Sequence, residues 1–240
     1  MRDRRIATIT GRLVDVLDPC PRRIAVEDVA YGLASAVRFG NQCPQRHTVA
    51  QHSVHVARMM ARDKAPPLAV LHGLLHDAHE AYLGDLPAPI KPMVFYCRPT
   101  EPLSLLGSHY TLESRALLES RWQMAILQAL DIPEPDAVTI DLVAHYDRVA
   151  YCTEVRDLWG PLTEVSACLD DYDPSEADHQ PLGRVLAPHY AEAAFLFEFA
   201  DLIGLAGQTE EREGATDEHG SRRGDLVNLG DPVHPPRPLR

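Results

Sequence analysis

Apolar residues recur at helical spacing along most of this chain. Val49, His52, Val56 and Met59 stand three or four positions apart within residues 48–62. Such spacing places side chains on one face of an amphipathic helix, and it puts His52 on the apolar face. The pattern therefore predicts a helix that buries a histidine.

The next helical segment, Leu68–Leu83, is apolar on nearly all sides. A helix without a polar face has to be surrounded by protein, so this one is predicted at the centre of an α-helical domain. Gly84 follows the segment, and a glycine in this position commonly ends a helix. His76 and Asp77 are adjacent polar residues inside the apolar segment, which makes them the first candidates for chemistry.

The rest of the chain predicts an all-α fold, a helical bundle around the central helix. Prolines deny regular helix to Asp85–Leu106, which is expected to form a loop over the site. Near the N-terminus, residues 8–17 alternate enough to allow a short strand or hairpin. Further helices are expected at Val26–Val37, Leu112–Leu130, Asp141–Trp159 and Pro188–Leu205.

The composition fits a single domain followed by a tail. With 240 residues, of which 45% are hydrophobic, the chain can bury one sizeable core, and residues 1–206 are expected to form one domain. Residues 207–240 are rich in Gly, Glu, Arg, Asp and Pro and contain few large apolar side chains. Such a segment cannot bury enough surface to offset the entropy lost on ordering it, so a flexible C-terminal tail is expected.

Net charge and cysteine usage exclude several classes of protein. A formal net charge of -12 argues against nucleic acid as a partner, because binding a phosphate backbone requires clustered Lys and Arg. The cysteines are scattered and form no C-x-x-C pair, so neither a disulfide framework nor a thiolate zinc site is indicated. No segment has the pattern of a signal peptide or reaches transmembrane length, so a cytoplasmic protein without a membrane partner is expected.

Four side chains are candidate ligands of one divalent metal ion. Burying His76 and Asp77 without partners costs roughly 2–7 kcal/mol for each uncompensated polar group, and a metal ion offsets that cost. His52 and Asp147 lie on two other predicted helices, within or beside an apolar face. Two imidazoles and two carboxylates form a mixed nitrogen and oxygen shell that suits Mn, Co, Fe, Zn or Mg. Asp141 competes with Asp147, but its place at the expected helix start favours an N-cap role.

A metal ion at this point would allow hydrolysis of a phosphoester. A bound divalent cation lowers the pKa of a coordinated water and polarises a phosphoryl oxygen. Glu80 lies three residues beyond Asp77 and would share its helix face, so it is placed to orient the water or to transfer a proton. Asp85, just past the helix end, could do the same or hold a substrate hydroxyl. His72 and His79 are expected to support the ligands or simply to pack, and the neighbouring histidines His47 and His55 to lie at the surface or near the site.

The order and spacing of these residues resemble the HD-domain metal-dependent phosphohydrolases. The family pattern is a His, an adjacent His-Asp pair and a distant Asp, and it matches His52, His76 with Asp77, and Asp147. The string H-D-A-H-E-A-Y-L-G-D-L-P-A-P-I-K resembles the bacterial 5'-deoxynucleotidase branch of that family. The resemblance covers roughly residues 24–160.

This resemblance implies the roles of further residues. Glu80 and Asp85 match a Glu and an Asp that follow the pair in the 5'-deoxynucleotidase branch, which implies a catalytic role for both. Arg38 and Phe39 match an Arg followed by an aromatic residue, where the guanidinium would bind phosphate and the ring would contact base or sugar. Lys91 matches a Lys after the Pro-rich turn and is implied to bind phosphate. The branch has Trp at the position of Phe39.

The resemblance implies a hydrolase of nucleotide metabolism with one catalytic divalent metal ion. The expected reaction removes phosphate from deoxynucleoside 5'-monophosphates. A bacteriophage dATP triphosphohydrolase resembles the same pattern, so release of triphosphate from dNTPs is an alternative. A metal-stabilised nucleotide-binding module without turnover is an alternative of another class, although a purely structural site needs no extra carboxylate such as Glu80. Many relatives form dimers, so a homodimer is compatible with the resemblance.

Overall fold

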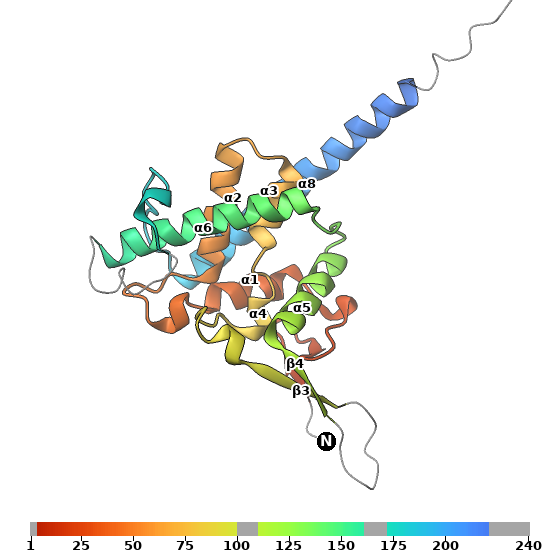
Figure 1. Ribbon diagram of the computed structural model, residues 1–240. Helices are drawn as coiled ribbons and strands as arrows, with labels where there is room; N and C mark the ends of the chain where they lie inside the picture. The colour runs from red at the N-terminus through yellow and green to blue at the C-terminus, as the bar shows by residue number, and fades with distance from the viewer. Residues whose placement is uncertain (1–3, 100–109, 161–171, 221–240) are drawn as a thin grey trace, which may run out of the picture.

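Helices make up most of the chain in the computed structural model, which describes residues 4–99, 110–160 and 172–220 (Figure 1). The predicted α class is therefore confirmed as a mainly α-helical fold. None of the helices in these ranges combines the length and apolarity that a membrane span needs. The α-helices are α1 (Val26–Ser35), α2 (Val49–Arg62), α3 (Pro67–Leu75), α4 (Glu80–Leu83), α5 (Arg115–Ala129), α6 (Ala137–Trp159) and α8 (Pro188–Gly220).

Within the described part of the chain, two antiparallel hairpins accompany the helices. A hairpin forms near the N-terminus, but only its second strand lies within the predicted residues 8–17: β1 (Arg5–Ala7) pairs with β2 (Leu13–Asp15), with Ile6 opposite Val14. A second hairpin, β3 (Phe95–Pro99) with β4 (Tyr110–Ser114), extends away from the helices (Figure 1). Short 3-10 helices connect the elements: η1 (Pro21–Arg23), η2 (Phe39–Asn41), η3 (Lys91–Met93) and η4 (Pro174–Glu176).

The second hairpin corrects two sequence predictions. Residues 95–99 were expected to belong to a loop, but aromatic residues such as Phe95 and Tyr96 favour a strand and pair with β4. The helix expected from Leu112 begins only at Arg115, because residues 110–114 are used by β4 and the Ser114 side chain then caps the helix by accepting from the Leu117 N–H. Residues 100–106 of the predicted loop lie outside the described residues.

The predicted continuous helix Leu68–Leu83 is wrong in its middle. Helix α3 ends at Leu75, and residues 76–79 form turns before α4. The backbone here tightens to i to i-3 hydrogen bonds, since the Ala78 N–H donates to the Leu75 carbonyl at 3.0 Å. His76 Nδ1 also lies 2.8 Å from the Gly73 carbonyl oxygen. In a regular helix this oxygen would accept from the backbone N–H of Asp77, four residues further on. The break changes the directions in which the His-Asp pair and Glu80 project.

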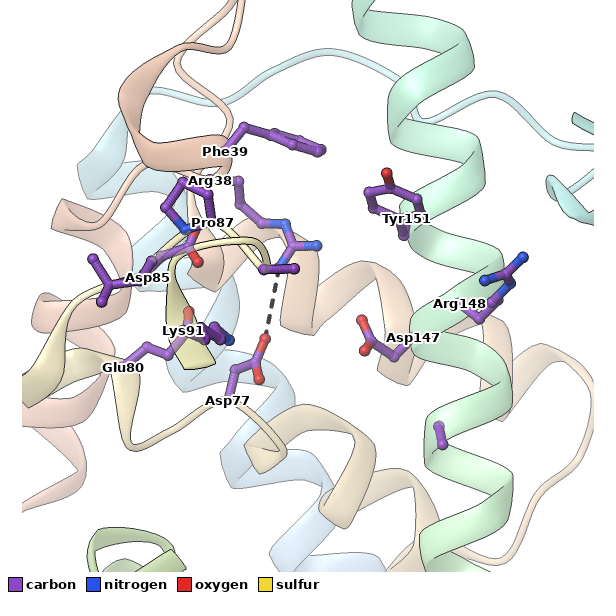
Figure 2. A pocket seen from close by; sticks show the side chains of 13 residues that line it. Arg38, Phe39, Asp77, Glu80, Asp85, Pro87, Lys91, Asp147, Arg148 and Tyr151 are labelled. Carbon is purple, nitrogen blue, oxygen red and sulfur yellow. Dashed lines mark hydrogen bonds and ion pairs between the residues drawn. The ribbon is translucent and has the colours of Figure 1, made fainter. Parts of the chain in front are cut away.

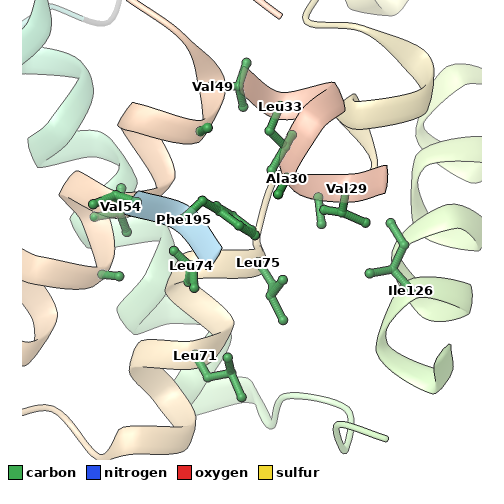
Figure 3. Packing of buried hydrophobic residues seen from close by; sticks show 14 of the residues in the cluster. Val29, Ala30, Leu33, Val49, Val54, Leu71, Leu74, Leu75, Ile126 and Phe195 are labelled. Atoms are coloured by element: carbon green, nitrogen blue, oxygen red, sulfur yellow. The ribbon is translucent and has the colours of Figure 1, made fainter. Parts of the chain in front are cut away.

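The α3 part of the central helix is buried as predicted. Leu71, Leu74 and Leu75 are fully buried and pack among α1, α2, α5 and α8 (Figure 3). Helix α6 lies across α2 and α3, so its inner face meets the helix that carries His52 and the helix that leads into His76 (Figure 1). The partners labelled in Figure 3 are Val29, Ala30 and Leu33 of α1, Val49 and Val54 of α2, Ile126 of α5 and Phe195 of α8.

Two helices extend beyond their predicted bounds. Helix α6 begins at Ala137, with Asp136 as the N-cap that accepts from the Thr139 N–H at 2.7 Å. The N-cap role expected for Asp141 is therefore wrong, and this residue is exposed on α6. Helix α8 continues to Gly220, so the backbone is helical over part of the segment predicted as a flexible tail. The rest of that segment, residues 221–240, lies outside the described residues.

Helices α1 and α4 approach each other closely at Gly32 and Ala81. A Cβ atom added at Gly32 would lie 2.5 Å from the backbone oxygen of Ala81 and 2.7 Å from its Cβ. Gly32→Ala is expected to lower the free energy of unfolding by about 1–3 kcal/mol, because α4 has to move. Gly204→Ala in α8 is the control, since no other part of the described chain lies within 4 Å of its added Cβ, and it should gain about 0.5–1 kcal/mol. Urea unfolding measures both, and equal stabilities would contradict the close packing.

Candidate metal centre

The structure brings the four predicted ligands together from three parts of the chain. His52 comes from α2, His76 and Asp77 from the turn after α3, and Asp147 from α6. His52 Nε2 lies 3.3 Å from His76 Nε2, 3.0 Å from Asp147 Oδ1 and 3.8 Å from Asp77 Oδ2. His76 Nε2 lies 3.2 Å from Asp77 Oδ2 and 3.6 Å from Asp147 Oδ1. His52, His76 and Asp147 thus form a group that can hold a metal ion, with Asp77 beside it.

The spacing and the chemistry of these atoms fit a divalent cation. Ligands bound at about 2.0–2.2 Å are separated from one another by about 3.0–3.6 Å in octahedral or tetrahedral geometry. Both Nδ1 atoms already have acceptors: His52 Nδ1 lies 2.6 Å from Glu154 Oε1, and His76 Nδ1 lies 2.8 Å from the Gly73 carbonyl oxygen. Protons on Nδ1 leave the two Nε2 lone pairs facing each other, which is the arrangement that a metal ion stabilises.

The electrostatics of the centre favour positive charge. Burial lowers the pKa of His76, but the nearby carboxylates of Asp77 and Asp147 more than offset it, and the pKa ends well above its usual value. Although burial raises the pKa of Asp147, its hydrogen bonds with His52 and His76 bring it below the usual range. The cluster therefore holds protons where a cation would bind, so metal affinity should fall at low pH as protons compete.

Glu154 supports the candidate ligand His52 and was not among the residues predicted from the sequence. Its side chain is fully buried and lies on α6 seven residues beyond Asp147, two turns along the same face. It accepts from Arg38 Nε at 3.0 Å and lies 3.0 Å from His47 Nε2, in addition to its contact with His52. Burial raises the pKa of Glu154, but Arg38 and the two histidines bring it well below the usual value. His47, expected at the surface or near the site, is fully buried beside it.

A cavity of about 390 Å³ opens beside the candidate metal ligands (Figure 2). Helix α6 forms one wall with Asp147, Arg148 and Tyr151, and the loop after α4 forms the opposite wall. The Asp147 side chain is 43% exposed, so the ligand group is accessible from this cavity. The loop contributes Asp85, Leu86, Pro87, Ala88 and Lys91, and the remaining lining residues include Arg38, Phe39, Asp77 and Glu80.

Arg38 lies in the cavity between two carboxylates. Its Nε donates to Glu154, and its NH1 atom lies 3.6 Å from Asp77 Oδ2 (Figure 2). Burial lowers the pKa of Arg38, but the surrounding carboxylates raise it above the usual value, so the guanidinium stays charged. The residue expected to bind phosphate is thus held next to the candidate metal ligands, with its charge directed into the cavity.

Glu80 and Lys91 form a second charged pair in the cavity. Lys91 Nζ donates to Glu80 Oε1 at 3.1 Å, whereas the buried Glu80 Oε2 has no hydrogen-bond partner among the described residues. Burial and the carboxylates of Asp77 and Asp85 raise the pKa of Glu80 to about 7. A carboxyl group with this pKa can both donate and accept a proton near neutral pH. The break between α3 and α4 leaves Glu80 facing the cavity, on the same side as Asp77 (Figure 2).

Phe39 lies in a strained turn at the rim of the cavity. Phe39, Gly40 and Asn41 have φ values of 59, 61 and 64°, in the left-handed region that costs a residue with a Cβ about 1–2 kcal/mol. The turn packs the Phe39 ring edge-on against Trp159, with 4.8 Å between ring centroids, and near Tyr151. Strain of this kind is commonly retained at ligand sites, and here it fixes an aromatic surface at the cavity.

A second group of candidate ligands adjoins the first. Asp77, His79 and Glu80 bring one ligand atom each within 4.8 Å of one another. The Lys91 ammonium group beside Glu80 opposes a second cation there. His79 instead contacts Gln123 Oε1 through Nδ1 at 3.4 Å, which fits the supporting or packing role expected for it.

Comparison with known proteins gives relatives without an assigned function. No family model matches the chain. The chain is 40% identical over 91 residues to an uncharacterised protein of Rhodobacter capsulatus, a match that spans 36% of this chain and 46% of that protein. It is 34% identical over 182 residues to the uncharacterised protein YfdR of Escherichia coli, a match that spans 76% of this chain and 86% of YfdR. The chain belongs to the YfdR family. Membership of the YfdR family assigns no reaction, so the chemistry has to be argued from the site.

Proposed function

We propose that this chain is a divalent-metal-dependent phosphohydrolase that removes phosphate from deoxynucleoside 5'-monophosphates. The observation that carries the proposal is the position of the ligand group. It opens onto a cavity that also contains Arg38, Lys91 and Glu80. A volume of about 390 Å³ lies within the range of small-molecule sites, about 300–1,000 Å³. A metal centre, the nearby cations Arg38 and Lys91, and a carboxyl group of raised pKa together match what phosphoester hydrolysis requires.

The residues of the chain have separable roles in this reaction. A divalent ion held by His52, His76, Asp77 and Asp147 would supply an activated water and polarise a phosphoryl oxygen. Arg38 would bind the phosphate through its outward N–H groups. Glu80 would accept the proton of the attacking water or pass it to the leaving oxygen, and Lys91 would hold Glu80 in place and add positive charge.

The charge balance of the cavity favours a monophosphate over a triphosphate. The three cations of the cavity each already face carboxylates: Arg38 faces Glu154 and Asp77, Lys91 faces Glu80, and Arg148 faces Glu176. A triphosphate carries more negative charge than these partly neutralised cations can balance. The aromatic surface of Phe39 would then contact the sugar or base of a nucleoside monophosphate.

A substrate panel tests the proposal. The purified chain is incubated with dNMPs, NMPs and dNTPs in the presence of Mn(II), Co(II), Zn(II) or Mg(II), and the products are separated. Orthophosphate released from dNMPs, and abolished by a chelator, is the expected result. Inorganic triphosphate released from dNTPs would replace the proposal with the triphosphohydrolase alternative. Nucleotide binding without any release would support the non-catalytic binding module.

Arg38→Lys provides a second prediction, specific to phosphate binding. Lysine keeps the positive charge but lacks the planar guanidinium, which can donate to Glu154 and to a phosphate at the same time. We expect kcat/KM for a dNMP to fall about 10–100-fold, mainly through a higher KM, because phosphate is bound less well in ground and transition states alike. The matched control is Arg58→Lys, since Arg58 pairs with Glu198 at the surface and is 60% exposed. Steady-state kinetics that show equal values for both variants would contradict the role of Arg38.

A further inference from the structure

The buried carboxylate of Glu154 contacts two kinds of functional residue at once. Its Oε1 atom lies 2.6 Å from Nδ1 of the metal-ligand candidate His52, and its Oε2 atom accepts from Nε of Arg38 at 3.0 Å. His47 Nε2 approaches Oε1 as a third donor, at 3.0 Å. Since the Glu154 side chain is 0% exposed, no water competes for these contacts. Each oxygen is therefore committed to a different part of the site.

We propose that Glu154 is a positioning residue that sets the metal-binding tautomer of His52 and the orientation of the phosphate-binding Arg38. The inference rests on the proposed function for the role of Arg38, whereas its metal half stands on the ligand geometry alone. By accepting the Nδ1 proton, Glu154 leaves Nε2 of His52 as the free nitrogen that faces His76 and Asp147. By accepting from Nε, it holds the guanidinium so that NH1 is directed toward Asp77 and the cavity.

A neutral amide cannot replace this carboxylate. In Glu154→Gln, only one oxygen remains as an acceptor, and the new NH2 group has to meet either the Nδ1 proton of His52 or the Nε proton of Arg38. If the NH2 group faces His52, two N–H groups oppose each other unless His52 changes tautomer and carries its proton on Nε2, the atom that faces the metal site. If the NH2 group faces Arg38, the guanidinium has to turn away from the cavity. The variant should therefore lose affinity for the metal, for phosphate, or for both.

Metal affinity provides a test that needs no turnover. Zn(II) binding is measured by competition with a chromophoric chelator for the full chain, and Glu154→Gln is expected to bind about 10–100-fold more weakly than the wild type. Two variants serve as controls and should stay within threefold of the wild type. Glu198→Gln removes an equal charge from the pair with Arg58, and His47→Gln disturbs the same buried cluster without touching His52. An equal loss of Zn(II) affinity in His47→Gln and Glu154→Gln would show that any change in the buried cluster weakens the site, and it would overturn the proposal.

Two further measurements complete the experiment. In spectra of 15N-histidine-labelled wild-type protein loaded with Zn(II), His52 is expected to carry its proton on Nδ1, and a proton on Nε2 would overturn the proposal even if Glu154→Gln does not fold. Inorganic phosphate is then titrated into Zn(II)-saturated wild type and Glu154→Gln, and weaker binding by the variant supports the orientation of Arg38. These readouts are independent of hydrolysis, so a failed substrate panel would reject the proposed function without deciding the role of Glu154.

Discussion

Replacing Asp77 with alanine is expected to abolish metal binding and the proposed phosphatase activity together. Asp77 Oδ2 lies within 3.8 Å of both imidazole Nε2 atoms and 3.6 Å from Arg38 NH1, so one carboxylate links the candidate metal ligands to the proposed phosphate-binding group. The loss of a supporting hydrogen-bond partner already costs 10–100-fold in metal affinity, so the loss of a ligand should cost at least about 100-fold. Activity should fall to background, because water activation and charge neutralisation depend on the same ion.

Three measurements check this result against a matched variant. Asp141→Ala removes an exposed carboxylate from α6 and should keep metal content and activity. Zn(II) at 100 times the wild-type Kd should raise the stability of the wild type and of Asp141→Ala by about 2.7 kcal/mol, whereas Asp77→Ala should gain no more than about 0.4 kcal/mol. Metal analysis, thermal unfolding and phosphate release give independent readouts. An Asp77→Ala protein that retains bound metal and activity would overturn the assignment of the centre.

Much of the fold follows from periodicity, because the helices are amphipathic or wholly apolar. The stripe of α2 places His52 inward, and the apolar α3 is buried at the centre, as the pattern indicates. The convergence of His52, the His-Asp pair and Asp147 was predicted from their unusual polarity within apolar surroundings. A fully buried histidine and three partly buried polar residues that meet at one point need a shared partner, and their place within apolar sequence made that requirement visible.

The break in the central helix and the buried position of Glu154 could not be predicted from the same pattern. At the break after Leu75, the His76 side chain takes the Gly73 carbonyl as its hydrogen-bond acceptor in place of a backbone N–H. Hydrophobic periodicity carries no information about such a bond. Glu154 was missed because a lone Glu in a helix usually faces solvent, and its three donors come from distant positions in the chain. Its spacing of seven residues from Asp147 was the available signal, since that spacing repeats a helix face.

Glu80→Gln is expected to lower kcat and to raise the stability of the protein at pH 8. Removing a general acid or base typically costs 10²–10⁴-fold, and the glutamine amide keeps the size of the side chain while losing its proton transfer. The buried Oε2 atom, which has no partner among the described residues, is the atom that would exchange the proton. The KM for a dNMP should change little, because Arg38 and the metal ligands are intact.

The stability gain follows from the pKa of Glu80, which is raised from its usual 4.5 to about 7. Between these values the folded protein binds more protons than the unfolded chain, so the free energy of unfolding falls as pH rises through this window. In the wild type, the penalty is absent below pH 4.5 and complete above about pH 7. Glutamine never ionises, so Glu80→Gln should be more stable than the wild type by about 1–3 kcal/mol at pH 8, and the difference should shrink toward pH 5.

Urea unfolding in the presence of a chelator, at pH 5 and at pH 8, measures the difference between the two proteins. The chelator keeps bound metal from shifting the pKa of Glu80. Glu27→Gln is the control, because Glu27 is an exposed carboxylate in the first turn of α1, and its stability should stay within about 0.5 kcal/mol of the wild type at both pH values. A Glu80→Gln variant that is inactive but no more stable at pH 8 would show that Glu80 is ionised without cost in the folded protein. Its role as a proton carrier poised near neutral pH would then have to be abandoned, and an anionic role beside Lys91 would replace it.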